Sequence, residues 1–497
     1  MINELLLTPI KSFRLRYLPL LMLYFAYGAA SFSGIAESFF VKEQLNFSAA
    51  TLMMIAVWLT LPWTVKMVFG QLVDSIPIFG SIRRAYIFIA GGFMVIGGLL
   101  LAGLAGKWQW VFQLGSSLTL YLTANLLIVI GLVLQDVVAD AMSVEVVVRT
   151  GQTEEAIKHE LAMVQLLGRL ALSIAMFLVA GLGGWLAEVV SYQTIFLLTL
   201  IIPFISVSSC LLVNLEVPVL KPVNWKILGG GILYAWFIIL TSWLAIPFNQ
   251  EIIFLVSLIV VIYFLNLVIK DVAKPIKKQI ICAAIVIFIY RAMPAVGPGL
   301  QWWEIDVLGF NKVFFGTLAQ ISAGLTIVGM WAFAKYITQK PIGWIFITLT
   351  IIGTVLSLPV LGMYYGLHHW TQTIFGFGAQ TIAIIDTAVG SPFAQLSMIP
   401  MLTLIAIYAP RGNAATWFAL MASLMNLALM AGNLISKLLN QIWIISREIK
   451  NPAGEIIVQA NYNHLGILLW ITVVAGFVIP IAAVLVFLKR DLSTKTN

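Results

Sequence analysis

The chain has 497 residues, of which 61% are hydrophobic and 10% are charged, and its formal net charge is +8. A soluble domain carries roughly 25% charged residues, so the composition excludes a soluble globular protein and predicts an integral membrane protein. The apolar runs have helical length, about 20 residues each, which excludes a barrel of short alternating strands.

Apolar runs begin near residue 18 and continue almost to the end of the chain. The charges of residues 1–17 precede a full-length run and no cleavage site follows, so we interpret this stretch as mature sequence. The pattern predicts an all-α membrane protein with about 14 transmembrane helices. We expect them at about 18–40, 48–72, 84–105, 117–147, 160–188, 193–213, 227–248, 252–269, 279–299, 313–335, 342–364, 378–408, 413–443 and 464–488.

Basic residues gather on one side when the helices alternate from a cytoplasmic N-terminus. Nineteen of the 28 Lys and Arg residues then lie in cytoplasmic segments, five on the opposite side and four within helices. This bias follows the positive-inside rule. It predicts cytoplasmic N- and C-termini in the cell inner (plasma) membrane, and it explains the net charge without a nucleic-acid partner.

The predicted helices fall into a group of six, a pair, and another group of six, separated by basic connections such as "IKDVAKPIKK". Two six-helix halves are the arrangement of major facilitator transporters; the alternative is a protein of 14 helices without an internal repeat. We therefore expect an N-terminal six-helix bundle over 1–215, a two-helix insert with its linkers over 216–275, and a C-terminal bundle over 276–497.

Ionisable residues at membrane depth are costly unless they face the bundle interior, a partner or water, so they are the first functional candidates. Glu37 lies in the outer part of the first predicted helix. It is a candidate for an outer gate and for proton coupling, with headgroup contact by snorkelling as the alternative.

The fourth predicted helix ends in "LQDVVADAMSVE", which brings three carboxylates after an uncharged run. Asp136 and Asp140 are four residues apart, so both lie on one helical face, about 6 Å apart along the axis. Two neighbouring carboxylates repel, which favours holding a proton; the alternative is a structural pairing with nearby cations. Glu145 lies nearer the cytoplasmic end, where we expect it to be solvated.

Two arginines lie within predicted helices. Arg169, in the fifth, is placed at a depth close to Asp140, and we expect the two to pair. Arg291 stands in "YRAMPAVGPG", where prolines and glycines break the helix just beyond it, and a broken helix at membrane depth must be buried in protein or line a cavity. A guanidinium there is a candidate to hold a substrate carboxylate or the edge of a planar ring, with a role as an interhelical strut weighed equally.

Further along the chain, Trp302 and Trp303 in "LQWWEIDVLGF" are expected at the outer interface as part of an aromatic belt, and they are also candidate stacking surfaces for a substrate. Asp386, in the run 378–408, is a second candidate for proton coupling. Lys437 is expected to snorkel to the headgroups. The loop at about 445–463 carries Asn-Pro and Gly and is predicted to be a surface loop with a turn.

The segment "LPWTVKMVFGQLVDSIPIFGSIRRAY" resembles the signature between helices two and three of the major facilitator superfamily. Its Gly70 would let two helices approach closely, and its aspartate, Asp74, would cap a helix end or pair across a cytoplasmic gate. Arg83 and Arg84 would neutralise that charge.

A finer pattern resembles the folate–biopterin transporter family. It consists of "YFAYG…FFVKEQLNFS", the segment just quoted, "LQDVVADAMSVEVV" and "AQLSMIPMLTLIAIYAPRGNAATWFALMASLMN", and so touches both halves. The resemblance implies that Lys66 belongs to the family's charged loop with Asp74, Arg83 and Arg84, and that Asp136 and Asp140 are its Asp-x-x-x-Asp pair. The remaining matches are Gln395, Pro400, Pro410, Ala415, Thr416 and Ala419.

This resemblance implies a secondary active transporter of folate or pterin substrates, coupled to protons and working by alternating access. Gln395 and Asp136 are also candidate substrate contacts. A carrier similar to muropeptide permeases, or another carrier of an organic anion, is the first alternative. A membrane assembly factor that does not transport is an alternative of another class.

An enzyme is not expected, because the four histidines fall at loops or helix ends and no HExxH spacing exists. The two cysteines, Cys210 and Cys282, lie in apolar runs and are expected to pack in the core, and we expect no metal or cofactor. The expected partners are therefore the substrate, protons and the lipid bilayer around a monomer.

Overall fold

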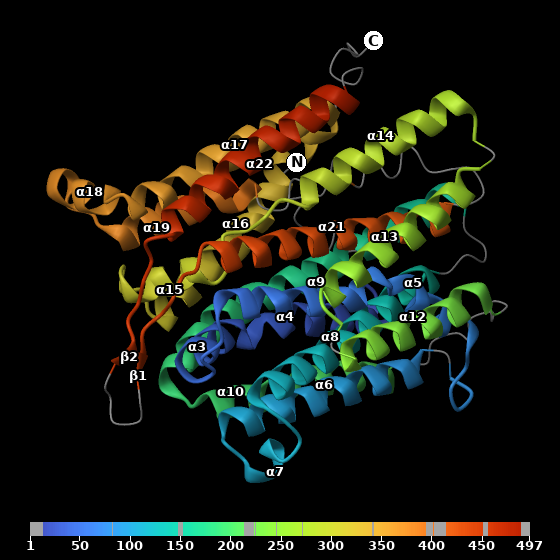
Figure 1. The fold of residues 1–497 in the computed structure, drawn as a ribbon. Coiled ribbons are helices and arrows are strands. Elements are labelled where there is room, and N and C mark those ends of the chain that lie inside the picture. The colour runs from blue at the N-terminus through green and yellow to red at the C-terminus, as the bar shows by residue number, and fades with distance from the viewer. Residues whose placement is uncertain are drawn as a thin grey trace. The chain divides into compact units, whose positions relative to one another are not determined.

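The computed structural model of the protein describes the chain apart from residues 1–12, 82, 148–152, 213–222, 224, 245, 271, 340–341, 394–400, 402–413, 451–455 and 489–497. The described elements are helices except for one short hairpin, and the chain divides into two compact units (Figure 1). Unit 1 comprises Met1–Leu45, Val65–Phe237 and Phe315–Gln320; unit 2 comprises Asn46–Thr64, Ile238–Phe314 and Ile321–Asn497.

Within the described residues, twelve helices are long and apolar enough to cross a membrane, and a helix pair bent by 103° at Leu367–Phe375 and Ala379–Phe393 adds a thirteenth if it counts as one span. The prediction of a multi-pass all-α membrane protein is confirmed. The remaining predicted span, 279–299, corresponds to a helix that ends at Arg291 and begins with several lysines. Its four charged residues, Lys274, Lys277, Lys278 and Arg291, keep it out of the set of twelve.

Unit 1 is built from helices that follow the predicted runs closely. Their bounds are η1 (Leu15–Tyr17), α2 (Leu18–Ala29), η2 (Ala30–Ser33), α3 (Gly34–Gln44), α5 (Lys66–Ser75), α6 (Arg84–Ala105), α7 (Gln109–Phe112), α8 (Ser117–Glu145), α9 (Glu154–Val189), α10 (Tyr192–Leu198) and α11 (Ile201–Leu212). Most of α12 (Trp225–Trp243) also belongs to this unit.

Close packing of α6 on α8 depends on two glycines. A Cβ at Gly97 would come within 2.5 Å of the Ala124 carbonyl oxygen, and one at Gly131 within 2.6 Å of the Ala90 carbonyl oxygen. Real Cβ atoms do not approach backbone oxygens this closely, so only hydrogen fits at these positions. The glycines therefore set the separation of the two helices.

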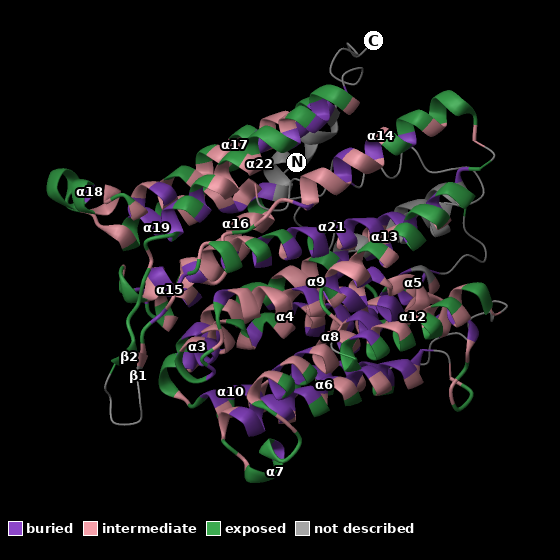
Figure 2. Cartoon of the chain, viewed as in Figure 1, coloured by how far each residue is buried: buried purple, intermediate pink, exposed green. Residues whose placement is uncertain are grey.

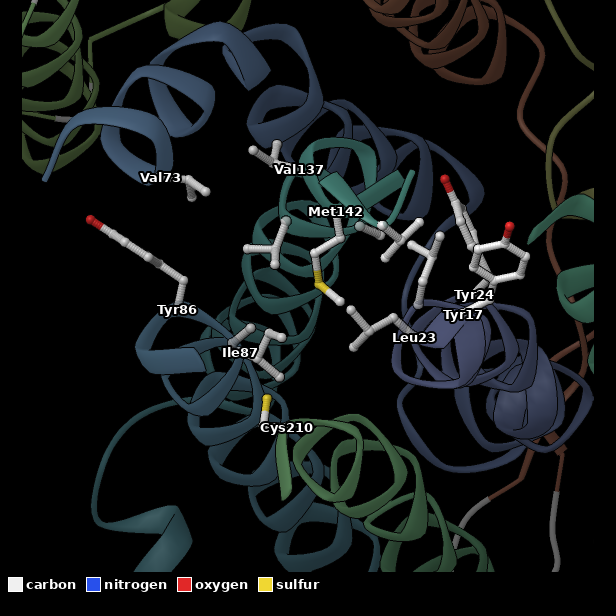
Figure 3. Close-up of a cluster of buried hydrophobic side chains, with 14 of the residues drawn as sticks. Tyr17, Leu23, Tyr24, Val73, Tyr86, Ile87, Val137, Met142 and Cys210 are labelled. Atoms are coloured by element: carbon white, nitrogen blue, oxygen red, sulfur yellow. The ribbon is translucent and has the colours of Figure 1, made fainter. Parts of the chain in front are cut away.

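The apolar core of unit 1 lies between α2, α5, α6, α8, α9 and α11 (Figure 3). Large side chains fill it: Tyr17 and Tyr86 are each 1% exposed, and Leu23 is fully buried. Cys210 is also buried in this core, as the sequence predicted, while Cys282 of unit 2 is half-buried. These large side chains pack closely against one another, so the helices of unit 1 have defined positions relative to each other.

Unit 2 contains the end of α12, the remaining helices apart from Phe315–Gln320 of α16, and the hairpin. Their bounds are α4 (Ala49–Thr64), α13 (Asn249–Val268), α14 (Lys274–Arg291), α15 (Gly299–Asp306), α16 (Lys312–Gln339), α17 (Ile342–Tyr364), α18 (Leu367–Phe375), α19 (Ala379–Gly390), η3 (Ser391–Phe393), α21 (Ala414–Ile442), β1 (Ile449–Lys450), β2 (Ile456–Val458) and α22 (Leu465–Phe487). The strands are antiparallel, with Ile449 opposite Val458, so the predicted surface loop near 445–463 is a hairpin in its described part.

Trp302 and Trp303 of α15 are only 2% and 4% exposed and lie in a core of unit 2 with Leu361, Leu465 and Leu469. The guanidinium of Arg447 stacks over the Trp302 ring, 5.3 Å from its centroid. The expectation of an aromatic belt at the outer interface is therefore wrong, because helices and the segment before β1 cover both rings.

The apolar helices that are long enough to cross a membrane differ strongly in how much of their surface is buried within the protein (Figure 2). In the most apolar stretches of α6 and α21, 61% of the residues are buried within the protein, whereas in that of α12 only 11% are buried. Large apolar side chains such as Leu233, Trp236 and Trp243 are exposed along α12. Exposed apolar side chains of this kind suit contact with the hydrocarbon of a bilayer.

Candidate functional site

A lysine lies between the two aspartates of α8. Lys66 Nζ donates to Asp136 Oδ2 at 2.5 Å and to Asp140 Oδ2 at 2.7 Å. The Asp136 side chain is 17% exposed, that of Lys66 24%, and that of Asp140 54%. Two carboxylates thus share one ammonium at membrane depth, and one of them remains open on one side. We call these three residues the Lys66 cluster.

Lys66 reaches this position because the second transmembrane stretch is interrupted. Pro62 lies inside α4 and has no N–H to continue the helical ladder. The helix ends at Thr64, Val65 leaves helical geometry with φ −105° and ψ 20°, and α5 restarts at Lys66. The lysine is therefore the first residue of a new helix, and its side chain extends toward α8.

The expected pairing of Arg169 with Asp140 is wrong for the described residues. Arg169 of α9 is exposed, and the ion pair of Asp140 is made with Lys66 instead. A similar expected depth does not tell which side of a neighbouring helix a residue occupies.

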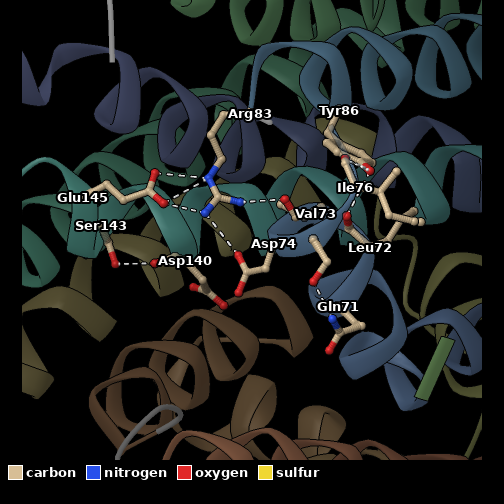
Figure 4. A network of polar contacts seen from close by, with 11 residues as sticks. Gln71, Leu72, Val73, Asp74, Ile76, Arg83, Tyr86, Asp140, Ser143 and Glu145 are labelled. Carbon is tan, nitrogen blue, oxygen red and sulfur yellow. Dashed lines mark hydrogen bonds and ion pairs between the residues drawn. The ribbon is translucent and has the colours of Figure 1, made fainter. Parts of the chain in front are cut away.

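Arg83 organises a second polar network at the end of unit 1 that holds the signature loop (Figure 4). Its Nε donates to Glu145 Oε2 at 3.1 Å, its Nη2 donates to Asp74 Oδ1 at 3.1 Å, and its Nη1 donates to the Val73 carbonyl at 3.0 Å. Burial opposes its charge, but the hydrogen bonds and charges of Glu145 and Asp74 outweigh this and raise the pKa of Arg83.

Several expectations for this segment need correction. Glu145 is not a solvated carboxylate, since it pairs with the buried guanidinium of Arg83. Gly70 does not mediate a close approach between described helices, because a Cβ there would meet no described residue within 4 Å. Arg84, which was expected to neutralise Asp74 together with Arg83, is the first residue of α6. The hydroxyl of Tyr86 completes the loop by donating to the Leu72 and Ile76 carbonyls at 3.0 and 2.7 Å.

One charged group of unit 1 escaped the sequence analysis. Glu160 of α9 is 8% exposed; it accepts hydrogen bonds from Arg16 and from the Tyr17 hydroxyl, and Arg14 Nη1 lies 3.8 Å away. One indication of this ion pair is present in the sequence: Glu160 lies in the first two turns of its helix, and basic residues stand just before the first transmembrane run.

Glu37 of α3 is hydrogen-bonded to uncharged groups of α8. The Tyr121 hydroxyl donates to its Oε1 at 2.7 Å, and Asn125, one turn further along α8, is 8% exposed and donates to the Tyr121 carbonyl at 3.1 Å. Among the described residues no basic side chain forms an ion pair with Glu37.

In unit 2, Arg291 is the last residue of α14, and the chain that follows is not helical until Gly299, as predicted. Arg291 Nε donates to the Met425 carbonyl at 3.3 Å. The broken segment is satisfied by α21: the Ser436 hydroxyl accepts from the Ala295 amide at 2.9 Å, and Asn440 Nδ2 donates to the Val296 carbonyl at 3.0 Å. This agrees with the rule that broken backbone at membrane depth is buried in protein.

Asp386 lies on α19, and its Oδ1 is buried with no hydrogen-bond partner among the described residues. Lys437 of α21 is buried rather than snorkelling: its Nζ donates to Glu251 Oε1 at 2.5 Å and to Gln250 Oε1 at 3.3 Å. Gln395 and the prolines at 400 and 410 lie outside the described residues.

The pattern that defines the BT1 family matches residues 28–496 of this chain. The chain belongs to the BT1 family. The resemblance to folate–biopterin transporters is thereby confirmed, and the chain is a membrane transporter of this family rather than an enzyme.

Curated relatives of this BT1 protein carry transporter names. It is 25% identical over 414 residues to "Folate-biopterin transporter" of Synechocystis sp., covering 83% of this chain and 72% of the relative. It is 22% identical over 405 residues to "Folate transporter 1" of Plasmodium falciparum, covering 81% and 68%. With "Probable folate-biopterin transporter 4" of Arabidopsis thaliana it shares 28% identity over 198 residues, 39% of this chain and 37% of the relative.

Solved structures confirm the major facilitator fold of this BT1 protein. A POT family transporter in complex with 5-aminolevulinic acid matches with a TM-score of 0.63 at 15% identity, covering 96% of each chain. The nucleoside transporter NupG matches with a TM-score of 0.60 at 12% identity, covering 94% of this chain and 98% of the other. At these identities the likeness concerns the fold alone.

Proposed function

We propose that this BT1 protein is a secondary active transporter of a folate or pterin, driven by a proton gradient through alternating access of two six-helix bundles. The single observation that carries the proposal is the Lys66 cluster, in which one ammonium serves two carboxylates of different exposure. Its residues stand at membrane depth, where charges are retained mainly for function.

The charge of the Lys66 cluster supports proton coupling. One ammonium and two carboxylates sum to minus one, and a single proton on either aspartate makes the cluster neutral. A neutral cluster loses less solvation energy than a charged one when water access changes sides. Binding and release of one proton would therefore lower the barrier between states. Glu37 and Asp386 are further candidate proton carriers in units 1 and 2.

The chemistry of a pterin fits a carboxylate. Its pyrimidine edge presents an amino group next to a ring N–H, and a carboxylate accepts two parallel hydrogen bonds of this kind. We assign this role to Asp136, or to the more open Asp140, after partial release from Lys66. The carboxylates of a folate tail would need a cation, for which Arg291 is the proposed group and Arg169 the second choice.

Proteoliposome uptake tests the proposal. Labelled folate, pterin and an anhydro-muropeptide are offered to one preparation, with and without an imposed proton gradient. Gradient-dependent accumulation of folate or pterin is expected. Accumulation of the muropeptide alone would support the related carrier class, and no transport of any of the three would favour an assembly factor.

We also propose that the protein lies in the inner (plasma) membrane as a monomer with both termini cytoplasmic, based on the distribution of basic residues. The three-part division at 1–215, 216–275 and 276–497 remains part of this proposal. Reporter fusions after residue 497 and within 451–455 should be active on opposite sides. Activity of both fusions on one side would overturn the topology.

A further inference from the structure

An apolar groove of about 370 Å³ lies within unit 2, between the second helix of the insert and the first helix of the following segment. Leu258, Ile262 and Leu265 of α13 form one wall, Ala284 and Phe288 of α14 form the other, and Leu424 of α21 contributes to the lining. Figure 1 shows α13 and α14 running roughly alongside each other.

The groove is a fixed part of unit 2, because α13 is anchored to the unit by polar contacts. Lys437 of α21 donates to Glu251 and Gln250 at the start of α13, and Gln250 Nε2 donates in turn to the Met54 carbonyl of α4 at 2.9 Å. A lysine that is 8% exposed, with an acidic partner on the insert helix, holds the wall in place. The groove is therefore not a chance opening beside a loose appendage.

The dimensions of the groove match a lipid chain. Its lining on α13 extends from Leu258 to Ile269, or about 16 Å at 1.5 Å per residue. One leaflet of the bilayer hydrocarbon is about 15 Å thick. Water would find almost no hydrogen-bond partners, since Asn266 is the polar residue among the lining side chains.

A cluster of lysines stands at one end of the groove. Lys270 follows the lining residue Ile269, and Lys274, Lys277 and Lys278 precede the lining residue Ile280. Among the described residues, none of these four lysines forms an ion pair with an acidic side chain. With Asp271 included, the segment 270–278 carries a formal charge of plus three. Asn266, one turn before Lys270 in the chain, also lines the groove.

We propose that the groove and its lysines bind one anionic phospholipid of the surrounding bilayer. Its acyl chain occupies the groove between α13 and α14, and its phosphate lies among Lys270, Lys274, Lys277 and Lys278. Clusters of Lys and Arg at the membrane surface favour acidic headgroups, and the apolar walls accept only hydrocarbon. On the proposed topology the lysines face the cytoplasmic leaflet. The insert thereby acquires a role as one wall of a lipid site.

Lipid titration of the purified protein in detergent tests the site, read by native mass spectrometry and by melting temperature. Wild type should bind one phosphatidylglycerol and gain several degrees of stability, whereas phosphatidylcholine with the same chains should do neither. Glycerophosphoglycerol, which has the headgroup without chains, should also fail. An equal effect of phosphatidylcholine would overturn the assignment, as would full stabilisation by the headgroup alone.

Two variants separate the parts of the site. Replacing all four lysines by Gln removes the cation cluster, and since each lysine near an anionic headgroup contributes a factor of about five, the affinity should fall by more than about tenfold. Ala284→Phe fills the groove and should abolish binding. Lys107→Gln and Val355→Phe, at exposed positions elsewhere, are the matched controls.

If Ala284→Phe does not fold, the smaller Ala284→Leu serves for the same measurement, with a weakened rather than abolished binding expected. Retention of wild-type affinity by either folded groove variant overturns the proposal, and so does retention by the folded four-lysine variant. Binding that is lost in the control variants as well would show a general response to surface substitution, and would equally overturn it.

Discussion

Lys66 and Asp140 are 74 residues apart in the chain, yet the lysine ammonium donates to the aspartate carboxylate at 2.7 Å while that carboxylate stays 54% exposed. The contact is therefore held on one side and open on the other. Because the Asp140 carboxylate is already accessible, it can exchange Lys66 for another partner without a rearrangement that exposes it.

The first prediction concerns the mutual dependence of Lys66 and Asp136. Lys66→Met should destabilise the protein by about 3 kcal/mol, since breaking a buried pair leaves an uncompensated charge. Asp136→Asn added to it should restore part of the loss, because the double variant has one carboxylate fewer in need of a cation. Melting temperatures of the four proteins in this cycle measure the coupling; losses that simply add would show that the two residues act independently.

The second prediction addresses transport. Asp136→Asn, or Asp140→Asn, should abolish gradient-driven accumulation and leave substrate exchange partly intact, because the amide keeps shape and hydrogen bonding but cannot cycle a proton. Glu188→Gln, at an exposed acid on α9, is the matched control and should accumulate normally. Full accumulation by both aspartate variants would remove these residues from coupling.

The third prediction decides between two roles of Arg291. If it binds an anionic substrate, Arg291→Lys keeps the charge but loses the bidentate fork, so affinity should fall more than stability does. Arg291→Gln should then lose the rise in melting temperature that substrate produces. If the contact with Met425 is its whole role, both variants will melt lower without substrate and keep the full substrate-induced rise.

The fourth prediction is a pH dependence of stability. Burial raises the pKa of Glu304, on α15, to about 7. In the unfolded chain this group ionises near its ordinary value, so between about pH 4.5 and pH 7 the folded state binds more protons than the unfolded state, and stability falls as pH rises. Above about pH 7 the effect is complete. Over this pH range the free energy of unfolding should fall by an amount on the order of 2 kcal/mol, and Glu304→Gln should remove this fall. The variant should therefore show a flatter curve of melting temperature against pH. An unchanged curve would contradict the prediction.

The fifth prediction tests the anchor of the insert. Lys437→Met should lower the melting temperature, because Glu251 and Gln250 lose their donor at the start of α13, at a cost of roughly 1–3 kcal/mol for hydrogen bonds to charged groups. Lys437→Met combined with Glu251→Met should be more stable than Lys437→Met alone. Lys107→Met, at an exposed lysine, is the control for loss of a positive charge. A snorkelling lysine would give the same small effect as this control.

The positions of the helices and the break after Arg291 could be predicted because they depend on local patterns: runs of apolar residues, and prolines and glycines that end them. The partners of charged residues could not. Asp140 pairs with Lys66 rather than Arg169 because the interruption at Val65 turns one side chain toward α8, which is a matter of helix rotation and packing. Trp302 is buried in a core with Leu465, and Arg447, 145 residues further along, stacks over its ring; no local pattern contains that information.

The close contacts at Gly97 and Gly131 limit which mutations the gene can tolerate at these two codons. A single-nucleotide change in a glycine codon that alters the amino acid always adds at least one heavy atom to the side chain. At these two positions even the smallest such atom would collide with a carbonyl of the facing helix. Every missense change at either codon should therefore behave as a loss of function, so in a saturation library both positions should be depleted of all 19 alternatives, regardless of polarity.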